Sequence, residues 1–239
     1  MNQQRIAVVT GGNRGIGFEI CRQLAQQDFQ VVLTARNVAR GQAAADQLCQ
    51  DSGKVQFQPL DITDVQQIQD LVRRVTEQFG RIDVLVNNAG IYLDQHQAAL
   101  TIAPELITQA VNTDVCGTFA LCQAVIPLMQ ANRYGRIVNL SSRTSRLDQM
   151  NNLGLTYKIS KAAINVITVV LAQEVKDDNI LINAVNPGWI KTDMGGEAAQ
   201  QSPTAQAPDQ GAAGPVWLAT LPDDGPSGCF FNGCSRQPW

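Results

Sequence analysis

The stretch Thr10-Gly11-Gly12-Asn13-Arg14-Gly15-Ile16-Gly17 decides the fold. It follows the apolar, mostly β-branched residues 6–9, which predict a buried strand, and precedes residues 18–27, whose apolar members recur at helical spacing. A glycine-rich turn between a strand and a helix presents backbone N–H groups at a positive helix end, where they bind phosphate. Phe18 and Glu19 stand where a P-loop needs Lys and Ser or Thr, so the P-loop is excluded. Taken alone, these glycines also fit an ordinary tight turn.

The composition indicates one globular α/β domain. The chain has 239 residues, of which 44% are hydrophobic and 16% charged, and this length can bury a large core. The formal net charge of −3 gives no reason to expect nucleic acid or an anionic membrane as a partner. Residues 1–5 run directly into the first predicted strand, and no uncharged apolar run approaches the ~18 residues that a membrane helix needs. We therefore expect a cytoplasmic protein without a membrane partner.

The cysteines and the single histidine exclude several kinds of site. Five of the six cysteines have small apolar neighbours or lie in predicted helices and strands, so we expect core thiols in a reducing compartment. A disulfide between Cys229 and Cys234 is the less favoured alternative. His96 lies in a polar loop, and the chain has neither a G-x-S-x-G elbow nor a C-x-x-C pair. A Ser-His-Asp hydrolase and a metal site are therefore not expected, and His96 is expected to be solvated.

Predicted strands and helices alternate along the whole chain. Strands are expected at residues 6–9, 31–34, 55–58, 82–86, 137–140, 180–185 and 228–231, and helices at 18–27, 38–49, 64–79, 104–129, 156–176 and 212–221. This order favours a single doubly wound Rossmann-type domain over residues 1–239, with a parallel sheet covered by helices on both faces. The Gln-, Ala- and Pro-rich residues 197–210 lie within 189–215, which we expect to form a mobile substrate loop.

Polar residues follow the predicted strands, at the edge where such a sheet binds its ligand. An NAD site usually has an acid after the second strand, but this chain has Arg36 there, with Arg14 in the glycine turn. Two arginines that contact a 2′-phosphate would favour NADPH over NADH, although both could instead be solvated. Asp61 could accept the adenine amine or only begin a helix. The small residues of Asn88-Ala89-Gly90 allow the backbone to approach a cofactor.

A serine, a tyrosine and a lysine follow the fifth predicted strand. Side chains alternate along a strand, so only one of Ser141 and Ser142 can face the site. Tyr157 and Lys161 are four residues apart on a predicted helix and share one face. A nearby ammonium lowers the pKa of a phenol by favouring the phenolate. This set suits a carbonyl, which receives hydride at carbon and a proton at oxygen.

With these motifs in place, the chain resembles a short-chain dehydrogenase/reductase over roughly residues 5–235. The matching motifs are residues 10–17, 87–90, Asn112, Ser142, Tyr157 with Lys161, and residues 186–192. Within the family, residues 12–14, 33–36 and 187–194 and Trp239 look most like NADPH-dependent carbonyl reductases. The resemblance implies a sheet of about seven strands in the order 3-2-1-4-5-6-7.

The resemblance also implies roles for the site residues. Tyr157 would be the general acid/base, Ser142 would hold the substrate oxygen, and Lys161 would bind the nicotinamide ribose. Asn112 would help to hold a proton-relay water beside Lys161. The full cofactor-binding set is then Gly11, Asn13, Arg14, Gly15, Ile16, Gly17, Arg36, Asp61, Ile62, Asn88, Ala89, Gly90, Tyr157, Lys161, Pro187, Gly188, Ile190 and Thr192.

The leading expectation is reduction of a ketone or aldehyde with NADPH. An NADP-dependent alcohol dehydrogenase working oxidatively and a non-catalytic NADP(H)-sensing protein are the alternatives. Carbonyl reductases of the family carry an insertion between the serine and the tyrosine that covers the association surface. Only residues 143–156 intervene here, which predicts a homodimer or homotetramer formed through residues 104–129 and 156–176.

The predicted walls of the substrate pocket leave two readings open. Leu147, Met150, Leu153, Trp189 and Met194 either line an apolar pocket or are ordinary core residues. Arg143 and Arg146 either receive an acidic substrate or are solvated, and the second reading is favoured.

Overall fold

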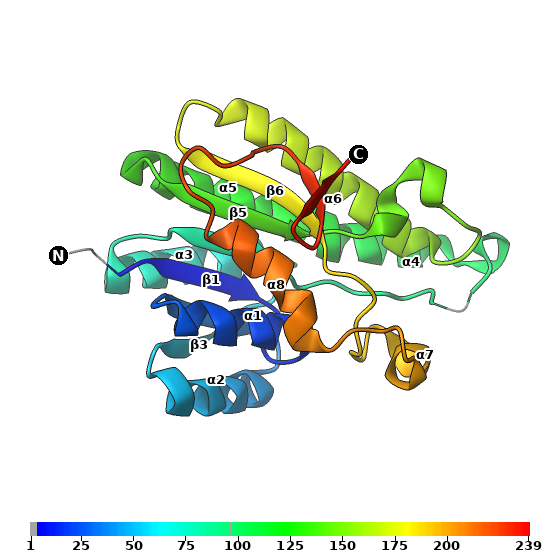
Figure 1. The fold of residues 1–239 in the computed structure, drawn as a ribbon, viewed down its shortest axis with the longest axis horizontal. Helices are drawn as coiled ribbons and strands as arrows, with labels where there is room; N and C mark the ends of the chain where they lie inside the picture. Colours follow the sequence, from blue (N-terminus) through cyan, green and yellow to red (C-terminus); the bar gives the residue numbers. More distant parts are fainter. Residues whose placement is uncertain (1–3, 96) are drawn as a thin grey trace.

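An eight-stranded sheet organises the molecule, whose computed structural model describes residues 4–95 and 97–239. The strand order is β3-β2-β1-β4-β5-β6-β7-β8, and every neighbouring pair is parallel except the last (Figure 1). The strands are β1 (Ile6–Thr10), β2 (Gln30–Ala35), β3 (Val55–Pro59), β4 (Val84–Asn87), β5 (Gly135–Leu140), β6 (Ile180–Asn186), β7 (Phe230–Asn232) and β8 (Ser235–Gln237). The expected doubly wound sheet is confirmed.

The strand count is eight, where about seven strands were expected. The additional strand, β8, runs antiparallel to β7 and pairs Ser235 with Asn232. A two-residue turn joins them, and its first residue, Gly233, has a φ of 57°, a conformation that glycine adopts without steric cost. The seven-strand order implied by the resemblance does not include the second strand of this short terminal hairpin.

Helices cover both faces of the sheet (Figure 1). They are α1 (Gly15–Gln26), α2 (Val38–Ser52), α3 (Val65–Phe79), α4 (Pro104–Ala110), α5 (Gly117–Asn132), α6 (Leu155–Glu174), α7 (Gly196–Gln201) and α8 (Pro208–Ala219). The limits of α3 show how the sequence sets them. The Asp64 side chain accepts hydrogen bonds from the backbone N–H groups of Gln66 and Gln67, and Gly80 ends the helix with a φ of 77°.

Two predicted helical regions differ from the structure. The region 104–129 is divided into α4, a π-helical turn at Val111–Cys116, and α5. The last predicted helix, 212–221, begins and ends earlier, as α8, and α7 covers residue 196 and the first five of the Gln-, Ala- and Pro-rich residues 197–210. A short bridge pairs Ile190 with Gln206, both of which lie in the expected substrate loop 189–215. The expected mobility of residues 189–215 stays a prediction.

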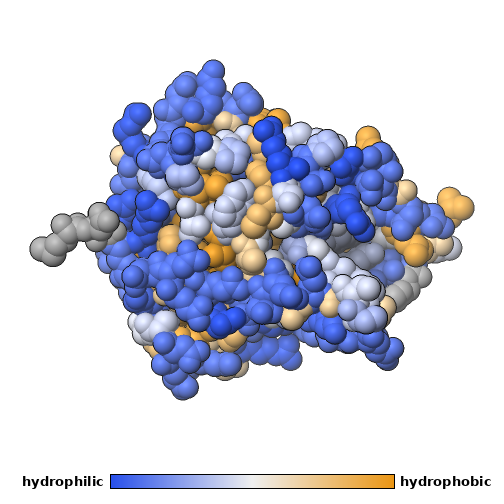
Figure 2. All heavy atoms as spheres, viewed as in Figure 1, coloured by the Kyte–Doolittle hydropathy of each residue, from blue (hydrophilic) through white to orange (hydrophobic). Residues whose placement is uncertain are grey.

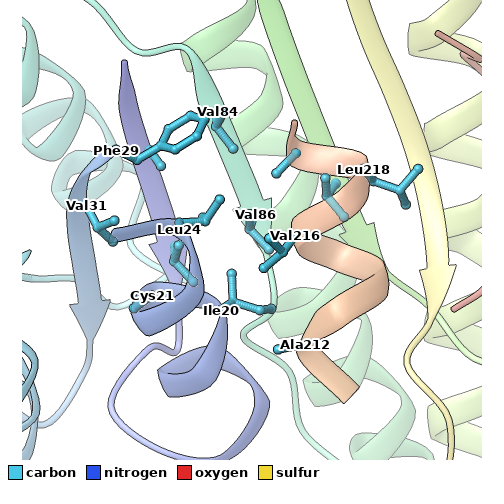
Figure 3. Packing of buried hydrophobic residues seen from close by; sticks show 14 of the residues in the cluster. Ile20, Cys21, Leu24, Phe29, Val31, Val84, Val86, Ala212, Val216 and Leu218 are labelled. Atoms are coloured by element: carbon cyan, nitrogen blue, oxygen red, sulfur yellow. The ribbon is translucent and has the colours of Figure 1, made fainter. Parts of the chain in front are cut away.

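Two apolar clusters form the core, one on each face of the sheet. In Figure 3, Ile20 and Leu24 of α1 lie beside Val216 of α8, over Val86 of β4. The second cluster packs α3, α5 and α6 against the opposite face. Full burial of each such side chain contributes about 1.5–3 kcal/mol, so these clusters hold the strand ends, and hence the site, in place.

The cysteine expectation is only partly right. Cys21, Cys122 and Cys229 are buried, but Cys49, Cys116 and Cys234 are exposed, since each lies on the outer side of its helix or at the terminal hairpin. All six are free thiols, so Cys229 and Cys234 are not joined. His96 lies outside the described residues.

The face of the molecule drawn in Figure 2 is mostly hydrophilic, most clearly over α1 and α2. Apolar side chains are exposed at the loops that flank α4 and α6, among them Leu100, Leu147 and Leu153. Residues 104–132 and Leu155–Glu174 are long and apolar enough to cross a membrane by length and composition alone. About half of each is buried within the fold, as in the core helix of a globular protein.

Candidate active site

A cavity of about 1230 Å³ lies at the carboxyl ends of β1, β2, β4, β5 and β6. The strand order reverses between β1 and β4, and this is where doubly wound sheets bind their ligands. Every site residue expected from the sequence lines the cavity, with the single exception of Asn112. The fold therefore gathers residues that are as far apart in the chain as Gly11 and Thr192.

The glycine turn forms the floor of the cavity at the N-terminus of α1. Gly15 has a φ of 56°, which side chains disfavour, and it starts the helix. A Cβ atom on Gly17 would lie 2.4 Å from the Gly11 carbonyl oxygen and 2.4 Å from Asn88 Nδ2. Only glycine allows this close approach, which leaves the N–H groups of the first helical turn open to a phosphate. The turn thus fits the pyrophosphate of a dinucleotide.

The β4 turn is fastened to the glycine turn by four hydrogen bonds. Thr10 Oγ1 accepts from the backbone N–H groups of Asn88 (3.0 Å) and Ala89 (2.9 Å). Asn88 Nδ2 donates to the carbonyl oxygens of Thr10 (2.7 Å) and Gly11 (3.1 Å). Asn88 therefore holds two strand ends at a fixed spacing, which is what a preformed cofactor site requires.

The two arginines differ in their surroundings. Arg36 is exposed at the end of β2 and lines the cavity. Arg14 also lines it, but its guanidinium forms an ion pair with Asp193 across the mouth. Asp61 Oδ1 accepts from the backbone N–H (3.0 Å) and the hydroxyl (2.8 Å) of Thr63. Asp61 therefore orders the turn before α3 and also borders the cavity.

A buried acid from another loop caps the helix that carries Tyr157. Asp94 is fully buried and accepts from the backbone N–H of Thr156 (2.9 Å) and from its hydroxyl (2.6 Å). A carboxylate at a helix N-terminus also interacts favourably with the helix dipole. The sequence analysis missed Asp94, because the contact joins residues 62 positions apart in the chain. Its function is to fix the first turn of α6 and hence Tyr157.

Tyr157 and Ser142 meet in the cavity. The Ser142 hydroxyl hydrogen-bonds the phenol and acts to lower the pKa of Tyr157, but burial outweighs this and raises that pKa to about 12. The expectation that the lysine ammonium lowers the phenol pKa is therefore wrong in its net direction. Ser141 faces away, since its hydroxyl donates to Asn165 Oδ1 at 2.6 Å. As the strand alternation predicts, one serine faces the phenol.

The ring of Tyr92 covers Tyr157. The two rings are stacked with centroids 4.6 Å apart and planes 22° apart. A Cβ atom added to Gly154 would lie 2.4 Å from the Tyr92 hydroxyl, so only glycine admits this ring at the entrance of α6. Tyr92 therefore limits the space in front of the phenol. Nothing in the sequence indicated this stacking of Tyr92 on Tyr157.

Lys161 is buried beneath Tyr157. Its Nζ donates to the Leu140 carbonyl oxygen at 2.9 Å and lies 5.5 Å from the centroid of the Tyr157 ring. Burial lowers the pKa of Lys161, and the carboxylate of Asp114 acts in the opposite direction. The Leu140 carbonyl oxygen at the end of β5 therefore holds the ammonium of Lys161 at the cavity, which Gly90 also lines.

Asn112 is not brought to this site. Its side chain is exposed and does not line the cavity, whereas Asp114, two residues later, is fully buried beside Lys161. Residues two apart on a helix point about 200° away from each other, so both cannot face the same lysine. The buried spacing Ala110, Asp114, Thr118 and Leu121 is the signal that could have identified the inward residue.

The segment after β6 forms the other wall. Pro187, Gly188, Ile190 and Thr192 line the cavity, and Thr192 Oγ1 accepts from the backbone N–H of Gly195 at 3.2 Å. Of the apolar residues in the expected substrate pocket, Leu147 is 84% exposed and Trp189 is 49% exposed, so neither is a core residue. Arg143 is exposed, and Arg146 is paired with Asp148.

The fold and this site together define an oxidoreductase of the dinucleotide-binding class. A family model described as short chain dehydrogenase matches residues 5–203. Carbonyl reductase [NADPH] 1 of Sus scrofa is 36% identical over 282 aligned positions, which cover 98% of this chain and 94% of the relative. The (+)-neomenthol dehydrogenase of Arabidopsis thaliana is 35% identical and covers 95% of this chain and 96% of its own.

Two solved structures share the fold. Salutaridine reductase from Papaver somniferum superposes with a TM-score of 0.81 at 30% identity, covering 97% of this chain and 100% of its own. A putative gluconate dehydrogenase from Agrobacterium tumefaciens superposes with a TM-score of 0.88 at 24% identity over 95% of this chain and 93% of its own. The chain belongs to the short-chain dehydrogenase family, and a nicotinamide cofactor is what the family and the cavity indicate.

Proposed function

We propose that this chain reduces the carbonyl group of a ketone or aldehyde with NADPH, in the cytoplasm. The observation that carries the proposal is the pair formed by Tyr157 and Ser142 in a cavity continuous with the glycine turn. Similarity to relatives named as NADPH-dependent carbonyl reductases supports it. NADPH, when bound, supplies the hydride.

The protein's part is to hold the carbonyl and deliver a proton. Ser142 would donate a hydrogen bond to the substrate oxygen, and Tyr157 would transfer its phenolic proton to that oxygen as negative charge develops there. Burial keeps Tyr157 in the neutral, proton-donating form, because its pKa is raised to about 12. The oxidative alternative would use the same residue as a base in its phenolate form, which burial disfavours.

The choice of NADPH depends on the two arginines at the mouth of the cavity. Arg36 occupies the position after β2 where an acid would bind an unphosphorylated ribose. Arg14, in the glycine turn, lines the same cavity and is exposed enough to exchange Asp193 for a phosphate. Asp61 and Ile62 would border the adenine, while Pro187, Gly188, Ile190 and Thr192 would border the nicotinamide.

Replacement of the phenol tests the reaction. Tyr157→Phe removes the transferable proton and keeps the ring that stacks on Tyr92, so carbonyl reduction should fall by about 100-fold or more while NADPH still binds. Tyr134→Phe is the matched control, because Tyr134 lies away from the cavity against Arg5 and Arg136. NADPH consumption at 340 nm over a panel of carbonyl compounds, and NADPH fluorescence for binding, are the measurements.

The results of these measurements distinguish the three candidate functions. Retained reduction in Tyr157→Phe would overturn the proposed role of Tyr157. NADPH binding without turnover of any carbonyl or alcohol would favour the sensing protein. Faster alcohol oxidation than carbonyl reduction at neutral pH would favour the dehydrogenase.

We also propose a homodimer or homotetramer that forms through α5 and α6. Phe119 on α5 is 42% exposed, and Val166 and Val170, one turn apart on α6, are 62% and 56% exposed. Exposed apolar side chains that cluster on a helix face indicate an interaction surface. A symmetric dimer would cover the same face of each chain.

A further inference from the structure

Asp114 is a buried acid with one unsatisfied oxygen. Its Oδ1 accepts the backbone N–H of Ile91 at 2.9 Å, but its Oδ2 has no hydrogen-bond partner among the described residues. The residue is fully buried on the π-helical turn that interrupts the helical region after α4. A buried carboxyl group without compensation is costly, so its position calls for a functional explanation.

Lys161 is a buried base whose ammonium is only partly hydrogen-bonded by the described residues. Its side chain is 4% exposed, and its ammonium has three donors, of which the Leu140 carbonyl oxygen accepts one. Burial favours the neutral amine and lowers the pKa of Lys161. Of the groups packed around it, Tyr157 presents a ring and a neutral phenol, and β5 presents a carbonyl. The charged group that acts on Lys161 is Asp114 of the π-helical turn.

The two groups face each other across Gly90. A Cβ atom on Gly90 would lie 3.4 and 3.5 Å from the two carboxyl oxygens of Asp114 and 3.5 Å from Lys161 Nζ. Carboxylate and ammonium therefore border one small space that a side chain would fill, within about 7 Å of each other. At this separation each charge stabilises the other and opposes burial, which raises the pKa of Asp114 and lowers the pKa of Lys161.

We propose that Asp114 is a positioning residue whose carboxylate keeps the buried Lys161 in its ammonium form, and thereby keeps it hydrogen-bonded beneath Tyr157. This inference rests on the proposed carbonyl reduction, in which Lys161 must be a charged donor to the cofactor ribose. Asp114 touches neither substrate nor cofactor in this scheme and acts through Lys161 alone.

The variant Asp114→Asn has the same shape without the charge. With the counter-charge gone, the pKa of Lys161 should fall by about one unit or more. The carboxylate of Asp114 also raises the pKa of Tyr157, so its loss lowers that pKa as well. Both changes move the alkaline fall of kcat/KM to lower pH. A direct titration of the lysine is therefore needed to separate them.

The experiment combines a pH profile with an NMR titration. The chain has five lysines, so labelling with ¹³C and ¹⁵N lysine gives a small set of side-chain signals, and Lys161→Arg identifies the one from Lys161. Asp51→Asn is the matched control, because it removes one acidic charge from the exposed end of α2. We expect a lower Lys161 pKa and a shifted alkaline limb in Asp114→Asn, and neither change in Asp51→Asn.

An unchanged Lys161 pKa in Asp114→Asn would overturn the inference, even if activity fell. Equal loss of kcat/KM at every pH, with no shift of the limb, would indicate a purely structural role and would also overturn it. If Asp114→Asn does not fold, Asp114→Ser removes the same charge and gives the same test. If the native chain reduces no carbonyl, the proposed function fails, while the NMR titration still decides the coupling.

Discussion

Removal of the Asp94 carboxylate should destabilise the whole domain through one helix end. Asp94 lies in the loop after β4 and accepts two hydrogen bonds from Thr156, at 2.9 Å from the backbone nitrogen and 2.6 Å from the hydroxyl. Both residues are buried, at 0% and 1% exposure, so water does not readily replace the lost acceptor. Asp94→Ala therefore leaves two donors unsatisfied at the start of α6.

The expected loss of stability follows from the two hydrogen bonds that Asp94 accepts from Thr156. A hydrogen bond to a charged group contributes about 1.5–3 kcal/mol, so two contribute about 3–6 kcal/mol. The substitution also removes the cost of burying a carboxylate, which offsets part of this loss of stability. We therefore expect Asp94→Ala to lower the free energy of unfolding by about 3 kcal/mol, a large share of the roughly 5–15 kcal/mol typical of a native domain.

Urea unfolding followed by tryptophan fluorescence measures this loss, and a double-mutant cycle with Thr156→Val isolates the pair. Asp148→Ala is the control, since Asp148 is an exposed acid of the neighbouring loop. Because Thr156 precedes Tyr157, kcat should also fall while NADPH binding changes less. A loss below about 1 kcal/mol, or additive effects in the cycle, would refute the argument that Asp94 caps α6.

Three further predictions concern the cofactor, the serine and the assembly. Arg36→Asp should lower the preference of kcat/KM for NADPH over NADH at least about tenfold, and an unchanged ratio would contradict the role of Arg36. Ser142→Ala should lower kcat about 100-fold, and because it removes a bond that lowers the Tyr157 pKa, the alkaline limb due to Tyr157 should not move to lower pH. Val166→Glu with Val170→Glu should give a monomeric mass by light scattering, and an unchanged oligomer mass would place the interface elsewhere.

Local patterns were sufficient to predict most of the fold. Strands such as β1 and β5 are buried on both faces, and this requires the continuous apolar runs that the sequence shows. The turn at Gly15 and Gly17 requires glycine at both positions, so the sequence alone was sufficient to predict it. The hairpin of β7 and β8 is only three residues on each side, too short for a periodic signal.

Contacts between distant residues could not be predicted in this way. Asp94 lies in a polar loop next to His96, and its partner Thr156 is on another element, so only the folded chain shows that this acid is buried. The π-helical turn at Val111–Cys116 creates a similar difficulty. Asn112, chosen by its place in a motif, is exposed on this turn, whereas Asp114 is buried.

The protonation of Tyr157 shows why spacing alone does not determine chemistry. A spacing of four positions between Tyr157 and Lys161 places the phenol and the ammonium on one helix face, from which a lowered phenol pKa was expected. In the structure, the ammonium of Lys161 donates to the Leu140 carbonyl and lies 5.5 Å from the ring centroid. Desolvation is then the larger effect, and the pKa of Tyr157 rises to about 12. Spacing along a helix therefore predicts that two groups are neighbours, but burial decides the direction in which the pKa moves.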